Sequence, residues 1–204
     1  TITTEVCNKN YENNKKLPKD VMPAVMKNIA KMEKKTGKKW NSTKNPLLVS
    51  VRSGAAISMP GMMDTILNLG LNEKTVEGLA EQTKNPRFSW DSYRRFIQLF
   101  GKVVFGVKDE KFDYILDEVK KKQGIQDDSK LNVESLKTIV LEYKKICEKH
   151  TKRKFPDTPD EQLVLAIEAV FKSWMGERAI VYREKNNITK DIANGTAVNI
   201  VAMV

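Results

Sequence analysis

Apolar side chains recur every three or four residues over most of this chain, and this spacing predicts a largely helical protein. From Asp64 to Gly176 the pattern stays helical throughout. Polar or glycine residues punctuate the apolar stripes where helices are expected to begin and end. The helices are predicted within 4–11, 20–37, 72–85, 90–104, 112–124, 132–147 and 158–176.

The starts of these helices carry capping residues. Asp20, Asn72 and Asn132 each stand directly before an apolar stripe, where a short polar side chain accepts a hydrogen bond from a free backbone N–H. The run 158–161, Thr-Pro-Asp-Glu, predicts a capping box with proline at the first helical position. Gly37 and Gly124 are expected to end their helices.

Strand character is confined to short β-branched runs outside the helical stretch. Strands are predicted at 47–51, 179–182 and 196–204, and the last two are expected to pair as antiparallel neighbours across the loop 186–194. The fold class is therefore α+β, with a mixed or antiparallel sheet interrupted by a helical subdomain. The chain is expected to divide into 1–70, 71–176 and 177–204.

Composition narrows the class of protein. The chain has 204 residues of which 40% are hydrophobic, enough to bury a core. Its two cysteines lack CxxC spacing and predict neither a disulfide framework nor a metal site. No apolar run reaches the roughly 20 residues of a membrane span, so a cytoplasmic protein is expected. The net charge of +10 comes from lysines spread over helical faces, and nucleic acid is not predicted as a partner.

The candidate chemistry lies in the segment 50–65. A buried strand leads to Arg52, and Gly54, Pro60 and Gly61 follow with small hydroxyl residues between them. Glycines let backbone N–H groups approach an anion, and a guanidinium offers forked donors to phosphate oxygens. We therefore expect a phosphate-binding loop. The alternative is an ordinary strand-to-helix turn with Arg52 on the surface.

This loop resembles the signature of pyruvate phosphate dikinase, the family in which Ser-Val-Arg-Ser-Gly-Ala is followed by Ser-Met-Pro-Gly-Met-Met-Asp-Thr. The resemblance covers nearly the whole chain. It continues in the same order at 68–72, 85–88, 91–98, 169–174, 178–183 and 195–199. The resemblance implies an ATP-grasp fold, of which this chain would supply one lobe and its helical insert.

The resemblance also implies the site. Arg52 would contact the ATP phosphates, and the segment from Gly61 to Met63 would close over them. Thr196 and Ala197 correspond to a strand that lines the same cleft. Ser53, Asp64, Thr65 and, from its place on a helix beside Arg94, Arg95 are further residues expected near ATP. For Arg95 and its neighbour Arg94, a structural ion pair with a nearby carboxylate is the alternative.

Other candidates are weaker. Asp64 could hold Mg²⁺, although a helix cap is the commoner role of an aspartate before a helical run. His150, the single histidine, is expected on a polar helix end, where the helix dipole favours it. No metal ligands are assigned within the chain, and most ligands for Mg²⁺ are expected outside it.

Two segments depart from the family pattern. Ala56 stands where the family usually has an arginine, which removes one positive charge beside the loop. The segment 186–196 is two residues longer than usual and lacks a tryptophan, so a reshaped loop is expected.

The resemblance implies the reaction of pyruvate, ATP and phosphate to phosphoenolpyruvate, AMP and diphosphate through a phosphohistidine. The chain is expected to be a fragment, inactive alone, that works with a second ATP-grasp lobe, a phosphohistidine domain and a pyruvate-binding barrel in a homodimeric parent. A phosphoenolpyruvate synthase and a non-catalytic helical interaction module remain the alternatives.

Overall fold

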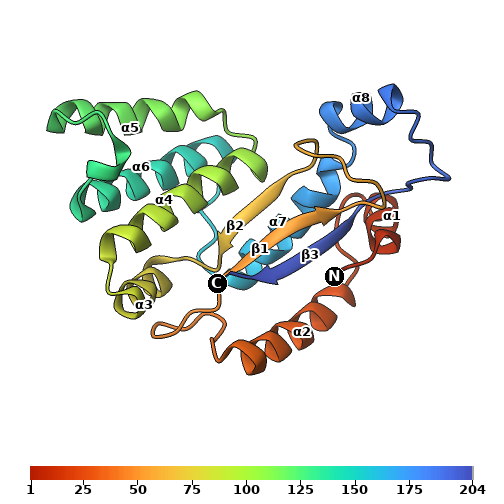
Figure 1. The fold of residues 1–204 in the computed structure, drawn as a ribbon, viewed down its shortest axis with the longest axis horizontal. Coiled ribbons are helices and arrows are strands. Elements are labelled where there is room, and N and C mark those ends of the chain that lie inside the picture. The colour runs from red at the N-terminus through yellow and green to blue at the C-terminus, as the bar shows by residue number, and fades with distance from the viewer. Residues whose placement is uncertain (204) are drawn as a thin grey trace.

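The computed structural model describes residues 1–203 and contains a small antiparallel sheet with helices packed around it (Figure 1). The three strands are β1 (Val49–Gly54), β2 (Thr65–Leu69) and β3 (Ala197–Ala202), in the order β2-β1-β3. In the register, Arg52 lies opposite Thr65 on one side and Asn199 on the other. The expected α+β class is confirmed.

The helices occupy most of the chain, as the apolar spacing predicts. They are α1 (Thr4–Glu12), α2 (Val21–Thr36), α3 (Glu73–Thr83), α4 (Pro86–Val103), α5 (Asp109–Gln123), α6 (Val133–Thr151), α7 (Pro159–Ser173) and α8 (Glu177–Lys185), with a short 3₁₀ turn at Asp128–Lys130. The predicted caps Asn72, Asn132 and Thr158 each accept a backbone hydrogen bond at the start of α3, α6 and α7, whereas Asp20, at the N-cap of α2, accepts none. Gly37 ends α2 in the left-handed conformation, as predicted.

One continuous core joins the sheet to the helices. Successive strand residues point to opposite faces, so Val49 and Val51 turn toward the core, where α7 packs against all three strands. On the other side of the molecule α4 packs between α3 and α6, and α4 also reaches β2 (Figure 1). Phe96 and Phe100 meet the ring of Phe155 there. The division of the chain at residues 70 and 176 stays a prediction.

The predicted strand at 179–182 is wrong, because these residues form the middle of α8. The β-branched pair Ile180 and Val181 favours a strand, but no neighbouring strand is available to pair with it. Ala179 instead becomes fully buried, and Tyr182, one helical turn later, packs on the same side. The expected pairing across the loop 186–194 is therefore also wrong, and β3 pairs with β1.

The prediction of helix directly after Asp64 is wrong as well, because Thr65–Leu69 is strand β2. The register between β1 and β2 is irregular between Val49 and Val51, so Ile66 and Leu69 are the buried residues of β2. In the sequence, the spacing of three residues between Ile66 and Leu69 matches the spacing of buried positions in a helix, which explains the wrong prediction. The first strand also begins later than predicted, at Val49, and extends to Gly54.

Both cysteines are buried and unpaired, which agrees with the prediction of no disulfide. Burial raises the pKa of the Cys147 thiol to about 12, so this side chain stays protonated near neutral pH. Among residues 1–203, no helix combines the length and apolar character that crossing a bilayer requires.

Candidate functional site

Arg52 lies inside β1, two residues before the strand ends, and not in the loop as the sequence suggested. Its side chain is exposed, and its Nε donates a hydrogen bond to Ser50 Oγ at 3.2 Å. Because the two residues are i and i+2 on one strand, they share the face of the sheet that is turned away from α7. The guanidinium forms no ion pair with a carboxylate among residues 1–203.

The face that carries Arg52 is open to solvent at Arg52 and Val201, although Ser50 on the same face is only 2% exposed. Val201, which pairs with Ser50 on β3, is 51% exposed on this face. Asn199, opposite Arg52, is partly exposed and accepts a hydrogen bond from Thr1 Oγ1 at 2.7 Å. The sheet therefore presents a cation and an amide side by side on an uncovered surface, a suitable combination for binding an anion.

The segment after β1 is anchored by a methionine. Met59 is 7% exposed and packs in a small apolar cluster with Trp174, Ala179 and Ala193. Met62 and Met63, both expected near ATP, pack against the edge of this cluster. Gly61 has a positive φ of 72°, which favours glycine at this position. The segment 55–64 is thus held in place by α8 and the end of α7.

Asp64 ends this segment and faces Arg178 of α8. The distance from Arg178 Nη2 to Asp64 Oδ1 is 3.5 Å, and Arg178 Nη1 donates to the Gly61 carbonyl at 3.4 Å. Burial raises the pKa of the Asp64 carboxyl, and the Arg178 charge opposes this shift. The expected helix-cap role of Asp64 is wrong, since a strand follows it.

Thr196 and Ala197 meet the end of β1, so the structure brings these distant residues beside Gly54. Thr196 is fully buried, and its Oγ1 accepts a hydrogen bond from the Gly54 N–H at 3.2 Å. Ala197 pairs with Gly54 in the sheet, while Ser53 pairs with Val198. Thr65 pairs with Arg52 from the other side.

Arg95 lies apart from this group, on the exposed surface of α4. Its Nε donates to Asp91 Oδ2 at 3.0 Å, and the buried Arg94 contacts Asp91 Oδ1 at 2.8 Å. The alternative of a structural ion pair is therefore confirmed for both arginines. A phosphate contact by Arg95 stays a prediction.

Three residues that the sequence reasoning left out also belong to this site. Asn199 flanks Arg52, Arg178 contacts Asp64 and Gly61, and the Ser173 Oγ accepts the Asp64 N–H at 3.3 Å. Asn199 had two signals, its place in the segment 195–199 that resembles the family and its position two residues after Ala197, on the same strand face. Ser173 and Arg178 lie in segments that resemble the family, at 169–174 and 178–183, but nothing singled them out there, because their contacts with Asp64 depend on how α7 and α8 pack.

The part of the chain described by the structure contains no group of three His, Cys, Asp or Glu side chains that could hold a metal ion. Near the loop the available carboxylate is Asp64, which already faces Arg178. Mg²⁺ is commonly held by one or two carboxylates together with substrate phosphates and water. These residues could therefore help to hold Mg²⁺ only when a bound polyphosphate supplies most of its ligands.

Comparison with known proteins places the chain in a family. Residues 9–204 match the family model described as pyruvate phosphate dikinase, AMP/ATP-binding domain. Curated proteins named pyruvate, phosphate dikinase match the whole chain: those of Entamoeba histolytica, Giardia intestinalis and Clostridium symbiosum are 52%, 50% and 47% identical. The chain spans 23% of the length of each of these relatives. The chain therefore belongs to the pyruvate phosphate dikinase AMP/ATP-binding domain family.

Proposed function

We propose that this chain forms one ATP-binding lobe of a pyruvate phosphate dikinase with an ATP-grasp fold. The observation that carries the proposal is Arg52, which projects from the uncovered face of β1 between Thr65 and Asn199. A guanidinium without a carboxylate partner on a sheet surface can bind phosphate oxygens with forked hydrogen bonds. The family description and the names of the relatives support ATP as the ligand.

In this proposal the neighbouring residues shape the phosphate site. Ser53, Thr65 and Ala197 belong to the strands around Arg52, Thr196 directly precedes β3, and Gly61 to Asp64 form the segment that would close over the phosphates. Phosphoryl transfer depends chiefly on positioning and on cations near the phosphate oxygens, which is the role given to Arg52. Mg²⁺ would neutralise phosphate charge, with most of its ligands outside these residues.

For a protein of the relatives' length we propose the conversion of pyruvate, ATP and phosphate to phosphoenolpyruvate, AMP and diphosphate. The chain would contribute only to the first step, in which ATP phosphorylates a histidine elsewhere in that protein. We also propose that such a protein contains the second ATP-binding lobe and a pyruvate-binding barrel, forms a homodimer and is located in the cytoplasm. The names of the relatives favour this reaction over that of a phosphoenolpyruvate synthase or a non-catalytic module.

Calorimetric titration of the chain with ATP and Mg²⁺ tests the role of Arg52. We expect weak binding, which Arg52→Ala reduces by about tenfold to a hundredfold, since a charge-assisted hydrogen bond contributes roughly 1.5–3 kcal/mol. Arg153→Ala is the matched control, because Arg153 is exposed and its side chain has no partner among residues 1–203. Equal ATP affinity in both variants would overturn the proposal for Arg52.

The reaction needs a second assay, on a protein of the relatives' full length. AMP formation from pyruvate and ATP that requires inorganic phosphate supports the dikinase reaction. The same rate without inorganic phosphate would indicate a water-using enzyme instead. Full AMP formation by the Arg52→Ala variant would favour the non-catalytic module for this part of the chain.

A further inference from the structure

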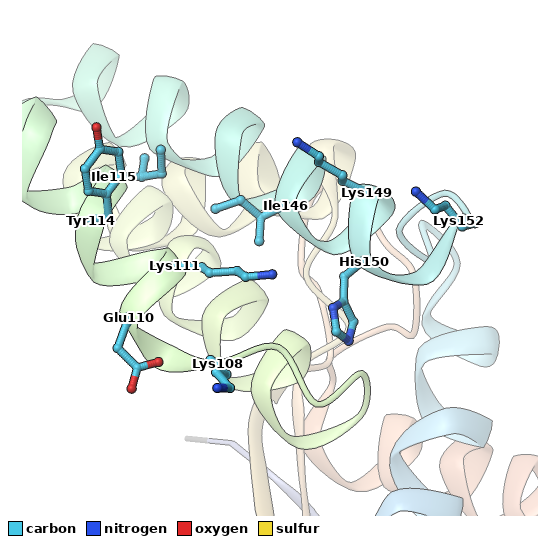
Figure 2. A pocket seen from close by; sticks show the side chains of 9 residues that line it. All are labelled: Lys108, Glu110, Lys111, Tyr114, Ile115, Ile146, Lys149, His150 and Lys152. Carbon is cyan, nitrogen blue, oxygen red and sulfur yellow. The ribbon is translucent and has the colours of Figure 1, made fainter.

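A second candidate site lies away from Arg52, in a hollow between α5 and the end of α6 (Figure 2). Its volume is about 750 Å³, which falls in the range of small-molecule sites. Lys108 and Lys111 reach it from the start of α5, and Lys149, His150 and Lys152 from the end of α6. Figure 2 shows the Lys111 side chain extending toward His150 across the hollow.

The hollow is strongly cationic. Its one acidic lining residue is Glu110, which Figure 2 shows on the Lys108 side of the hollow, apart from His150. Within residues 1–203 none of the four lysines forms an ion pair with a carboxylate. By contrast, Lys102 and Lys120 nearby are both paired with aspartates. Like charges gathered without counter-charges repel one another, and a bound anion would relieve this repulsion.

The other end of the hollow is apolar. Ile115 and Ile146 line it, and Tyr114 is 65% exposed beside them. Tyr114 lies one helical turn after Lys111, so an aromatic surface and an amine sit side by side on α5. A molecule with a planar ring and an anionic group could contact both at once.

Helix stabilisation explains only half of the positive charge. Lys149, His150 and Lys152 stand at the C-terminal end of α6, where the helix dipole favours cations. Lys108 and Lys111 stand at the N-terminal end of α5, where the same dipole disfavours them. The stability of α5 therefore does not account for Lys108 and Lys111.

We propose that this hollow binds a phosphorylated small molecule with an aromatic ring, of the mononucleotide class. The phosphate would lie between Lys111, Lys149 and His150, and the ring would pack on Tyr114 and Ile146. The volume favours such a ligand over a protein partner. This inference does not depend on the proposed function of Arg52, because the two sites share no residue.

His150 allows a direct test, because it is the single histidine and gives one imidazole Cε1–H signal in a proton NMR spectrum. The chain is titrated at fixed pH with AMP, adenosine and inorganic phosphate in separate samples. We expect AMP to move the His150 signal along a saturable curve, with an affinity at least about tenfold higher than that of adenosine or phosphate. Arg52→Ala should leave this response intact, which separates it from ATP binding at the loop.

Charge-neutralising variants complete the test. Lys111→Gln with Lys149→Gln should weaken AMP binding by about tenfold or more. Lys121→Gln with Lys122→Gln, at the far end of α5, removes the same charge from exposed positions and should change nothing. No saturable movement with AMP, or equal affinity in both double variants, would overturn the proposal. Equal affinity for AMP and inorganic phosphate would overturn the role of the ring.

Discussion

The Gly54 amide donates a hydrogen bond to the Thr196 hydroxyl at 3.2 Å, across 142 residues of sequence. This contact fixes the end of β1 to the start of β3, immediately before the segment 55–64. Gly54 also lies beside Asn199, the residue that flanks Arg52. The geometry of the segment 55–64 therefore depends on a part of the chain that lies at the opposite end of the sequence.

Replacing Thr196 with valine should destabilise the fold by about 1–3 kcal/mol, because the Gly54 N–H then loses its buried acceptor. Urea denaturation of both proteins measures the difference. Thr138→Val, an exposed change on α6, should alter the free energy of unfolding by less than about 0.5 kcal/mol. If the two variants are equally stable, the Gly54 to Thr196 bond contributes nothing.

Alanine at position 54 should disturb the open face of the sheet. A Cβ there would stand 2.5 Å from Asn199 Nδ2, so Asn199 must move and lose the hydrogen bond from Thr1. Because the clash is with the end of a flexible, partly exposed side chain, we expect the free energy of unfolding to fall by less than about 1 kcal/mol. Adding Asn199→Ala should recover most of the overpacking cost in a double-mutant cycle of unfolding free energies. If the unfolding free-energy changes of Gly54→Ala and Asn199→Ala simply add, the two side chains do not clash.

Truncating the buried Met59 to alanine should loosen the segment 55–64. The change removes the side chain that packs between Trp174 and Ala193, and large-to-small core changes of this kind cost about 2–5 kcal/mol. Hydrogen exchange should speed up in residues 55–64 more than in α4. The 53% exposed Met175 supplies the control, as Met175→Ala should leave exchange in that segment unaltered.

The carboxyl of Asp64 should make stability fall as pH rises. Burial raises its pKa in the folded protein, so between the ordinary value of 3.8 and the raised one the folded state binds more protons than the unfolded state. The free energy of unfolding must then decrease with pH in that window. Asp64→Asn should remove this decrease, measured as the difference between the two denaturation profiles. If the unfolding free energies of both proteins depend on pH in the same way, the pKa of the Asp64 carboxyl is not raised in the folded protein.

The helical part of the fold follows from local sequence. Asn72, Asn132 and Thr158 each cap a helix as predicted, because the bond between a cap side chain and the next turn involves only nearby residues. The site was predicted less completely. Arg52 and Thr196 were named from resemblance, whereas the packing of Met59 and the contact of Arg178 with Asp64 were found only in the structure.

The errors have a common cause. A strand is stabilised by the neighbours that it pairs with, and the sequence does not show which neighbours those are. Ile180 and Val181 therefore looked like a strand, and Ile66 and Leu69 like part of a helix.

The sequence by itself determined helices α1 to α7, the caps of α3, α6 and α7, the family and the presence of an arginine beside a glycine-containing loop, since each depends on residues close together in the chain. Only the tertiary structure decided that β3 pairs with β1, that Arg52 stands on an open sheet face, and that lysines of α5 and α6 gather in one hollow. These are contacts between distant segments, and they form because packing and chain topology bring the segments together.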